Sequence, residues 1–81
     1  MKYSFTTRFI HSYKTFSIPI QKKFDKQLKY LLTNLKHPSL KAKKFDETFS
    51  IWQARVDRGV RFYFLIKKDT YILLDIKHHA K

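Results

Sequence analysis

The chain has 81 residues, with 18 Lys and Arg against six Asp and Glu, which gives a formal net charge of +12. Its length indicates a single domain over residues 1–81. The absence of cysteine excludes disulfide bonds and thiolate metal sites, and it fits a reducing compartment. No apolar run approaches the ~18 residues that a membrane span requires, and no secretory signal is visible, so we expect a cytoplasmic protein with no membrane partner.

The positive charge is spread along the sequence rather than gathered in a tail. Residues 1–40 contain eight basic residues and one acidic residue, and residues 41–81 contain ten and five. The folded surface itself must therefore be positive, at a cost in self-repulsion. A surface that binds phosphates, or an acidic protein, would offset that cost. The charge thus predicts a nucleic acid or an acidic protein as the partner.

The first half of the sequence predicts one short strand followed by two helices. Residues 1–7 alternate loosely between polar and apolar, as in a strand, and residues 8–16 carry aromatic side chains at helical spacing. Ser17 and Pro19 mark a break and the start of a second helix. This helix has one apolar stripe and ends before Pro38. The stripe consists of Ile20, Phe24, Leu28, Leu31, Leu32 and Leu35.

The second half predicts three strands after a linker at residues 37–44. Apolar and polar residues alternate in three segments between residues 52 and 77, separated by short turns at residues 58–59 and 68–69. These strands are expected to form an antiparallel meander. The fold class is therefore α+β: one N-terminal strand, two helices, then a three-stranded antiparallel meander, with the helices packed on one face of the sheet.

The period of two in a strand divides these side chains between the faces of the sheet. The set expected to face the helices is Trp52, Ala54, Val56, Phe62, Phe64, Ile72, Leu74 and Ile76. The set expected on the opposite, open face is Arg55, Arg61, Tyr63, Asp75 and Lys77. His79 is in phase with the open set, whereas His78 points toward the helices. Several cations and a tyrosine therefore converge on one surface.

Four segments together resemble the RelE/ParE toxin superfamily. They are HPSLKAKKF at residues 37–45, IWQARV at 51–56, VRFYF at 60–64 and IKHH at 76–79. Each motif is degenerate, but their order and spacing cover nearly the whole chain. They are most similar to the RelE-like mRNA interferases of type II toxin–antitoxin modules. The predicted order of strand, helices and strands also agrees with the RelE-like fold.

The resemblance implies a toxin that cleaves mRNA on the ribosome without a metal or a cofactor. In this chemistry the ribose 2′-hydroxyl attacks the adjacent phosphate and expels the 5′-oxygen of the next nucleotide. The reaction requires a base, an acid, and cations that stabilise the pentacoordinate phosphate. The expected partners are an acidic antitoxin protein, the ribosome and mRNA, with no small-molecule cofactor.

Three residues are the catalytic candidates. Arg61 matches the recurrent active-site arginine of the family, and its planar fork suits two phosphate oxygens; the alternative is a pairing with Asp57 or Asp75. Arg55 is expected on the same face, where phosphate contact and structural pairing are equally open. His79 stands where many members have a C-terminal histidine, and imidazole can serve as acid or base near neutral pH.

Five further residues are the expected RNA-binding groups. Lys41, Lys43 and Lys44 form a dense basic run, in a region that family members use to hold RNA phosphates. Lys77 adds a cation to the open face, and Tyr63 either stacks on a base or packs within the sheet. The two adjacent histidines have no Cys and no Asp or Glu pattern beside them, so no metal site is expected.

The sequence departs from the family pattern at two places, which keeps two alternatives open. Val60 replaces the Tyr or His that often precedes the central arginine. Ala80 and Lys81 follow His79, where relatives often carry an acidic residue and an aromatic. One alternative is a ParE-like inhibitor of DNA gyrase without a nuclease site. The other is a non-catalytic module that binds RNA or the ribosome, a relic of a toxin.

Overall fold

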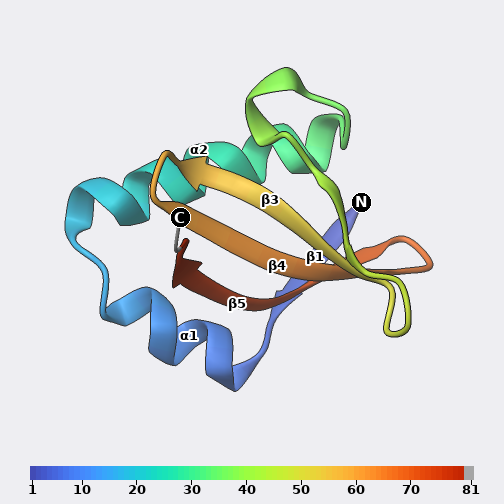
Figure 1. Ribbon diagram of the computed structural model, residues 1–81, viewed down its shortest axis with the longest axis horizontal. Helices are drawn as coiled ribbons and strands as arrows, with labels where there is room; N and C mark the ends of the chain where they lie inside the picture. Colours follow the sequence, from blue (N-terminus) through green and yellow to red (C-terminus); the bar gives the residue numbers. More distant parts are fainter. Residues whose placement is uncertain (80–81) are drawn as a thin grey trace.

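The computed structural model describes residues 1–79, which form a five-stranded mixed sheet with two α-helices (Figure 1). The strand order across the sheet is β1-β5-β4-β3-β2. The elements are β1 (Lys2–Phe5), α1 (Thr7–Lys14), α2 (Ile18–Thr33), the 3₁₀ turn η1 (Pro38–Leu40), β2 (Lys43–Asp46), β3 (Ile51–Asp57), β4 (Val60–Lys67) and β5 (Thr70–His78). β1 runs parallel to β5, and the other neighbouring strands are antiparallel. Within this range, no helix is long and apolar enough to cross a membrane.

The N-terminal strand and the two helices confirm the elements predicted for the first half. The side-chain oxygen of Thr6 caps α1 by accepting a hydrogen bond from the Phe9 N–H at 3.0 Å. α2 begins after Ser17 with Pro19 in its first turn, where the missing N–H of proline has no intrahelical partner to lose. It ends at Thr33, with Asn34 as its C-cap, before Pro38 as expected.

The hydrophobic core lies between the two helices and one face of the sheet. Phe24 of α2 contacts Phe9 of α1 with ring centroids 5.0 Å apart, and it packs edge-on against Phe62 of β4 at 5.1 Å. The three residues are only 1%, 2% and 0% exposed, respectively. Burying a side chain of this size stabilises a fold by roughly 1.5–3 kcal/mol. This face of the sheet therefore provides the stability of the domain.

One buried amide joins three elements within this core. Nε2 of Gln27 in α2 donates to the carbonyl oxygens of Ser39 in η1, at 3.0 Å, and of Arg55 in β3, at 2.8 Å. Its Oε1 accepts from the Ser39 hydroxyl at 3.2 Å. Because Gln27 is 3% exposed, these partners offset the cost of removing the amide from water. The contacts fix α2 against the strand that carries Arg55.

The structure corrects the prediction of a three-stranded meander. The sequence predicts a linker at residues 37–44, but four strands follow the helices, because β2 pairs with β3 along the edge of the sheet. The first three residues of β2, Lys43 to Phe45, are all exposed. An exposed edge strand needs no alternation of apolar and polar residues, so its sequence, KKFD, carries no periodic signal.

The structure also corrects the phase of the first half of β5. The sequence predicts Ile72 and Leu74 on the helix face, but Tyr71 and Leu73 are the buried residues there, with exposures of 4% and 0%. The pairing of β4 with β5 shifts by one residue at this point, which is a β-bulge. Such a shift moves the side chains beyond it to the other face. The predicted phase holds at Ile76, which is buried.

Candidate nucleic-acid interface

Three cations occupy directly opposed positions on three neighbouring strands. Arg55 of β3 pairs with Arg61 of β4, and Arg61 pairs with Lys77 of β5. We call these three residues the cation row. The strand phase predicted this convergence on the open face of the sheet. Like charges directly opposite each other destabilise a sheet, so the row costs stability unless an anion binds it.

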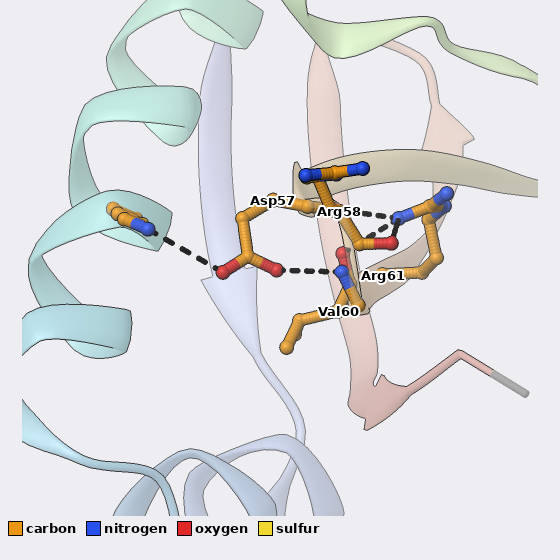
Figure 2. Close-up of polar contacts among 6 residues, drawn as sticks. Asp57, Arg58, Val60 and Arg61 are labelled. Atoms are coloured by element: carbon orange, nitrogen blue, oxygen red, sulfur yellow. Dashed lines mark hydrogen bonds and ion pairs between the residues drawn. The ribbon is translucent and has the colours of Figure 1, made fainter.

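The guanidinium group of Arg61 is held by the backbone of the turn between β3 and β4 (Figure 2). Its Nη1 donates to the carbonyl oxygens of Asp57 at 2.6 Å, Val60 at 3.2 Å and Arg58 at 3.4 Å. The sequence left open an ion pair between Arg61 and the carboxylate of Asp57 or Asp75. In the structure Arg61 instead contacts main-chain carbonyls. Among the hydrogen bonds of residues 1–79, only Nη1 is engaged in this way, which leaves Nε and Nη2 as donors for a ligand.

Asp57 fixes the same turn from the helix side. The pairing of β3 with β4 shifts between Arg55 and Asp57, which turns the Asp57 side chain toward α2. Figure 2 shows the carboxylate between the helix and the turn. Its Oδ1 accepts from the Gly59 N–H at 2.9 Å, and its Oδ2 lies 3.5 Å from the Lys23 ammonium. The turn that holds Arg61 is therefore connected to a helix.

Arg55 contains a buried nitrogen without a partner. Within the described part of the chain, its Nε is the one buried side-chain polar atom that makes no hydrogen bond. Leaving a buried donor unsatisfied costs about 1–3 kcal/mol. Because the residue is half-buried directly beside Arg61, an anion at the cation row would meet both guanidinium groups.

Tyr63 lies two residues beyond Arg61 on β4, next to the cation row. The ammonium of Lys77 lies 5.2 Å from its ring centroid, and the ring of Phe45 contacts it edge-on at 5.0 Å. Burial raises the pKa of the Tyr63 hydroxyl, Arg61 counteracts this, and the carboxylate of Asp75 adds to it, so that the pKa lies above its ordinary value of 10.0. The hydroxyl is therefore protonated at neutral pH and can donate a hydrogen bond.

Phe45 belongs to this surface, although the sequence did not reveal it as a site residue. It lies in β2 and is 58% exposed while its ring contacts Tyr63. The available signal was an aromatic residue directly after the basic run at residues 41–44. This pattern indicates a site residue only once β2 is known to pair with β3, which brings Phe45 to Tyr63.

The structure separates the three lysines of residues 41–44. Lys43 is opposite Gln53, and Gln53 is opposite Tyr63. Lys43 therefore lies on the open face. Lys44 is opposite Trp52, and its ammonium lies 5.5 Å from the indole ring, on the other side of the strand. Lys41 lines a groove of about 300 Å³ that Trp52 also lines. Of the three lysines, only Lys43 shares the face of the cation row.

His79 lies at the rim of the cation row. Its main-chain N–H donates to the Gly59 carbonyl at 2.8 Å, in the turn that holds Arg61, and the residue is exposed. His78 faces the helices as expected, with its ring 4.8 Å from that of Phe16. Over residues 1–79, no group of three or more His, Cys, Asp and Glu side chains has the geometry to hold a metal ion.

Comparisons with known proteins place this arrangement in a known fold. No protein-family model and no curated protein matches the sequence. The YoeB/ParE toxin from Agrobacterium tumefaciens matches with a TM-score of 0.82 and 13% identity, over 99% of this chain and 100% of that one. The YoeB dimer from Staphylococcus aureus matches with a TM-score of 0.83 and 18% identity, over 99% and 98%. This chain has the RelE/ParE toxin fold.

Other structures of the RelE/ParE fold extend the likeness to antitoxin complexes. The RelB-RelE antitoxin–toxin complex from Methanococcus jannaschii matches with a TM-score of 0.76 and 18% identity, over 91% of this chain and 87% of that one. The four motifs in the sequence predicted this fold, apart from strand β2. Since a shared fold does not determine function, the activity must be argued from the cation row and its neighbours.

Proposed function

We propose that the chain is a type II toxin that cleaves mRNA on the ribosome and is neutralised by an acidic antitoxin. The observation that carries this proposal is the cation row, in which Arg55 has an unsatisfied buried Nε and Arg61 is held by a turn. The likeness to YoeB and to the RelB-RelE complex supports it. So does the net charge of +12, which suits both RNA and an acidic protein.

In the proposed reaction the cation row binds the scissile phosphate. The 2′-oxygen of one ribose bonds to phosphorus, while the bond from phosphorus to the 5′-oxygen of the next nucleotide breaks. The products are a 2′,3′-cyclic phosphate and a 5′-hydroxyl end. Arg55 and Arg61 stabilise the charge that develops on the pentacoordinate phosphate. Because the guanidinium of Arg61 is already held by the β3–β4 turn, it needs little reorganisation.

Two proton transfers accompany this displacement. The 2′-hydroxyl loses a proton to a base, and the departing 5′-oxygen gains one from an acid. His79 is the proposed acid, because an imidazolium can donate a proton and the main chain of His79 is fixed to the turn that holds Arg61. Lys43 binds the RNA phosphates that flank the scissile one. Lys41 and Lys44 bind RNA phosphates from the other side of β2.

Primer extension on mRNA from cells that express the chain tests the proposal. The wild type is expected to give new 5′ ends at codon-phased positions, each with a 5′-hydroxyl. Arg61→Ala is expected to reduce cleavage by about 10²–10³-fold, as for the loss of a donor to the transition state. The matched control is Lys26→Ala, which removes one positive charge from an exposed position on α2 and should cleave like the wild type.

Intact mRNA under the same conditions would overturn the nuclease proposal. If growth arrest then comes with a DNA-damage response, the result assigns the chain to the gyrase inhibitors.

A second candidate function is a non-catalytic module that binds RNA or the ribosome. One observation favours it: Nη1 of Arg61 donates to three main-chain carbonyls, which is the behaviour of a structural arginine. In this case the chain would sediment with ribosomes while mRNA stays intact. Arg61→Ala would then lower the melting temperature without changing the pattern of 5′ ends.

A further inference from the structure

The open face of the sheet presents aromatic surface as well as charge. Phe45 is 58% exposed, and its ring contacts Tyr63 edge-on at a centroid distance of 5.0 Å. A single exposed aromatic residue is common on protein surfaces. This one differs because its neighbour Tyr63 adjoins the cation row, so that an apolar ring lies next to three opposed cations.

The accessible ring of this pair belongs to Phe45. Tyr63 is half-buried, and its ring is approached by both the Lys77 ammonium, at 5.2 Å, and the edge of Phe45. Tyr63 therefore packs against Phe45 and links it to the cation row through Lys77. Phe45 is left as the ring that a ligand can reach.

A backbone irregularity holds Phe45 in this position. Lys44 pairs with Trp52 and Asp46 pairs with Ile51, so that Phe45 stands between them without a partner in the register. Such a bulge bends a strand and redirects a side chain. The strand thus presents Phe45 toward Tyr63 rather than repeating a regular edge.

We infer that Phe45, supported by Tyr63, is a stacking platform for one unpaired base of a bound RNA, beside the row that takes its phosphate. An unpaired base exposes a π-face that stacks on Phe or Tyr, whatever its sequence. In a duplex the same faces are already stacked, so the platform selects single-stranded RNA. This inference rests on the proposed function and identifies the part of the substrate that the site recognises besides phosphate.

The surrounding charge favours a nucleic acid as the occupant. The charged groups around the platform are four cations, Lys43, Lys77 and the two arginines of the cation row, and one largely buried carboxylate, Asp75, which is opposite Tyr63. A base attached to a phosphodiester satisfies the ring and these cations together. An acidic protein would satisfy the cations, but nothing in its charge accounts for the exposed ring. Protein binding is therefore kept as an outcome of the test.

Fluorescence anisotropy with short labelled oligonucleotides tests the inference. The probe is a single-stranded 2′-O-methyl hexaribonucleotide, which is not cleaved because it has no free 2′-hydroxyl. A matched series of probes carries one abasic site at each position in turn. Phe45→Ala is expected to weaken binding of the intact probe by roughly 5- to 150-fold. On the probe that is abasic at the stacked position, the same substitution should cause no further loss.

Three further variants isolate the ring. Phe45→Trp should restore binding, because it replaces one aromatic face with another. Phe45→Leu keeps an apolar side chain but removes the π-face, and it should bind as poorly as Phe45→Ala. Phe49→Ala removes another exposed aromatic residue, 69% exposed, from the segment between β2 and β3, and it should bind like the wild type. Circular dichroism establishes that each variant is folded.

The outcomes separate this inference from the proposed function. If Phe45→Ala and Phe45→Leu bind the intact probe like the wild type while Arg55→Ala does not, the platform is wrong and the RNA site stands. Equal losses on intact and all abasic probes also overturn the platform. If the wild type binds no probe and leaves cellular mRNA intact, both proposals fail. Normal RNA binding by Phe45→Ala with loss of antitoxin binding assigns the ring to a protein interface instead.

Discussion

The two faces of the sheet differ in what their side chains contact. On the helix face, Phe62, Phe64 and Leu73 are completely buried among apolar neighbours. On the open face, the cation row and Tyr63 are only half-buried or exposed. Because successive residues of a strand point to opposite faces, β4 contributes to both with adjacent residues. The residues that stabilise the fold and the residues proposed to bind RNA therefore alternate along the same strands, and substitutions should separate the two roles.

Phe62→Ala is the substitution with the largest expected effect, and it acts on the helix face. Phe62 is 0% exposed and packs edge-on against Phe24 at 5.1 Å. Truncating a buried Phe lowers the free energy of unfolding by about 3–5 kcal/mol, because contacts are lost and a cavity remains. Urea denaturation followed by circular dichroism measures the loss. The matched change on the open face, Tyr63→Phe, should cost less than about 1 kcal/mol.

If Phe62→Ala and Tyr63→Phe lower the free energy of unfolding by similar amounts, the two faces do not differ in this way. The open face would then also stabilise the fold.

Arg55→Met tests whether a residue of the open face serves binding at the expense of stability. It removes one of three opposed cations and the unsatisfied Nε, while a flexible apolar chain still fills the space of the arginine stem. We expect the free energy of unfolding to rise by up to about 1 kcal/mol, because like-charge repulsion and an unsatisfied donor disappear. RNA affinity should fall, and the slope of its logarithm against log salt should decrease by about one.

Denaturation and salt-dependent anisotropy on the same preparation of Arg55→Met measure both quantities. A variant that is less stable than the wild type would instead make Arg55 a structural residue.

Tyr71 on the helix face gives the smallest expected effect. Burial raises the pKa of its hydroxyl above 10.0, so the folded state holds this proton more tightly than the unfolded state. Its contribution to stability is complete below the unfolded pKa and is lost as the pH rises through the folded pKa. The free energy of unfolding should therefore fall as the pH rises above about 10, and less so in Tyr71→Phe. An identical fall in both proteins would show that other groups control alkaline unfolding.

Much of the cation row could be predicted from the sequence. The turns on either side of β4 contain two residues each, at 58–59 and 68–69, and short turns fix the register of a hairpin. Once the register is fixed, the period of two brings Arg55, Arg61 and Lys77 together. The apolar stripe of α2 was equally informative, because a helix that packs on a sheet must bury one side.

The remaining features depend on geometry that residue types do not reveal. Strand β2 and Phe45 were missed because an exposed edge strand shows no alternation. The phase of Ile72 was wrong because a bulge in β5 shifts the pairing by one residue. The contacts of Arg61 could not be foreseen either, because they are made with the carbonyls of a turn and depend on its backbone path.

The place of β5 in the sheet also constrains the order in which the molecule folds. β5 lies between β1 and β4, and the Thr6 hydroxyl donates to the Leu74 carbonyl at 2.9 Å across 68 residues of chain. Contacts so distant in sequence form late, because a long loop must close first. A growing chain can form α2 and the β3–β4 hairpin before β5 exists, but it then lacks Lys77 and a partner for β1. The complete cation row therefore arises only once β5 has been synthesised and inserted between strands from opposite halves of the chain.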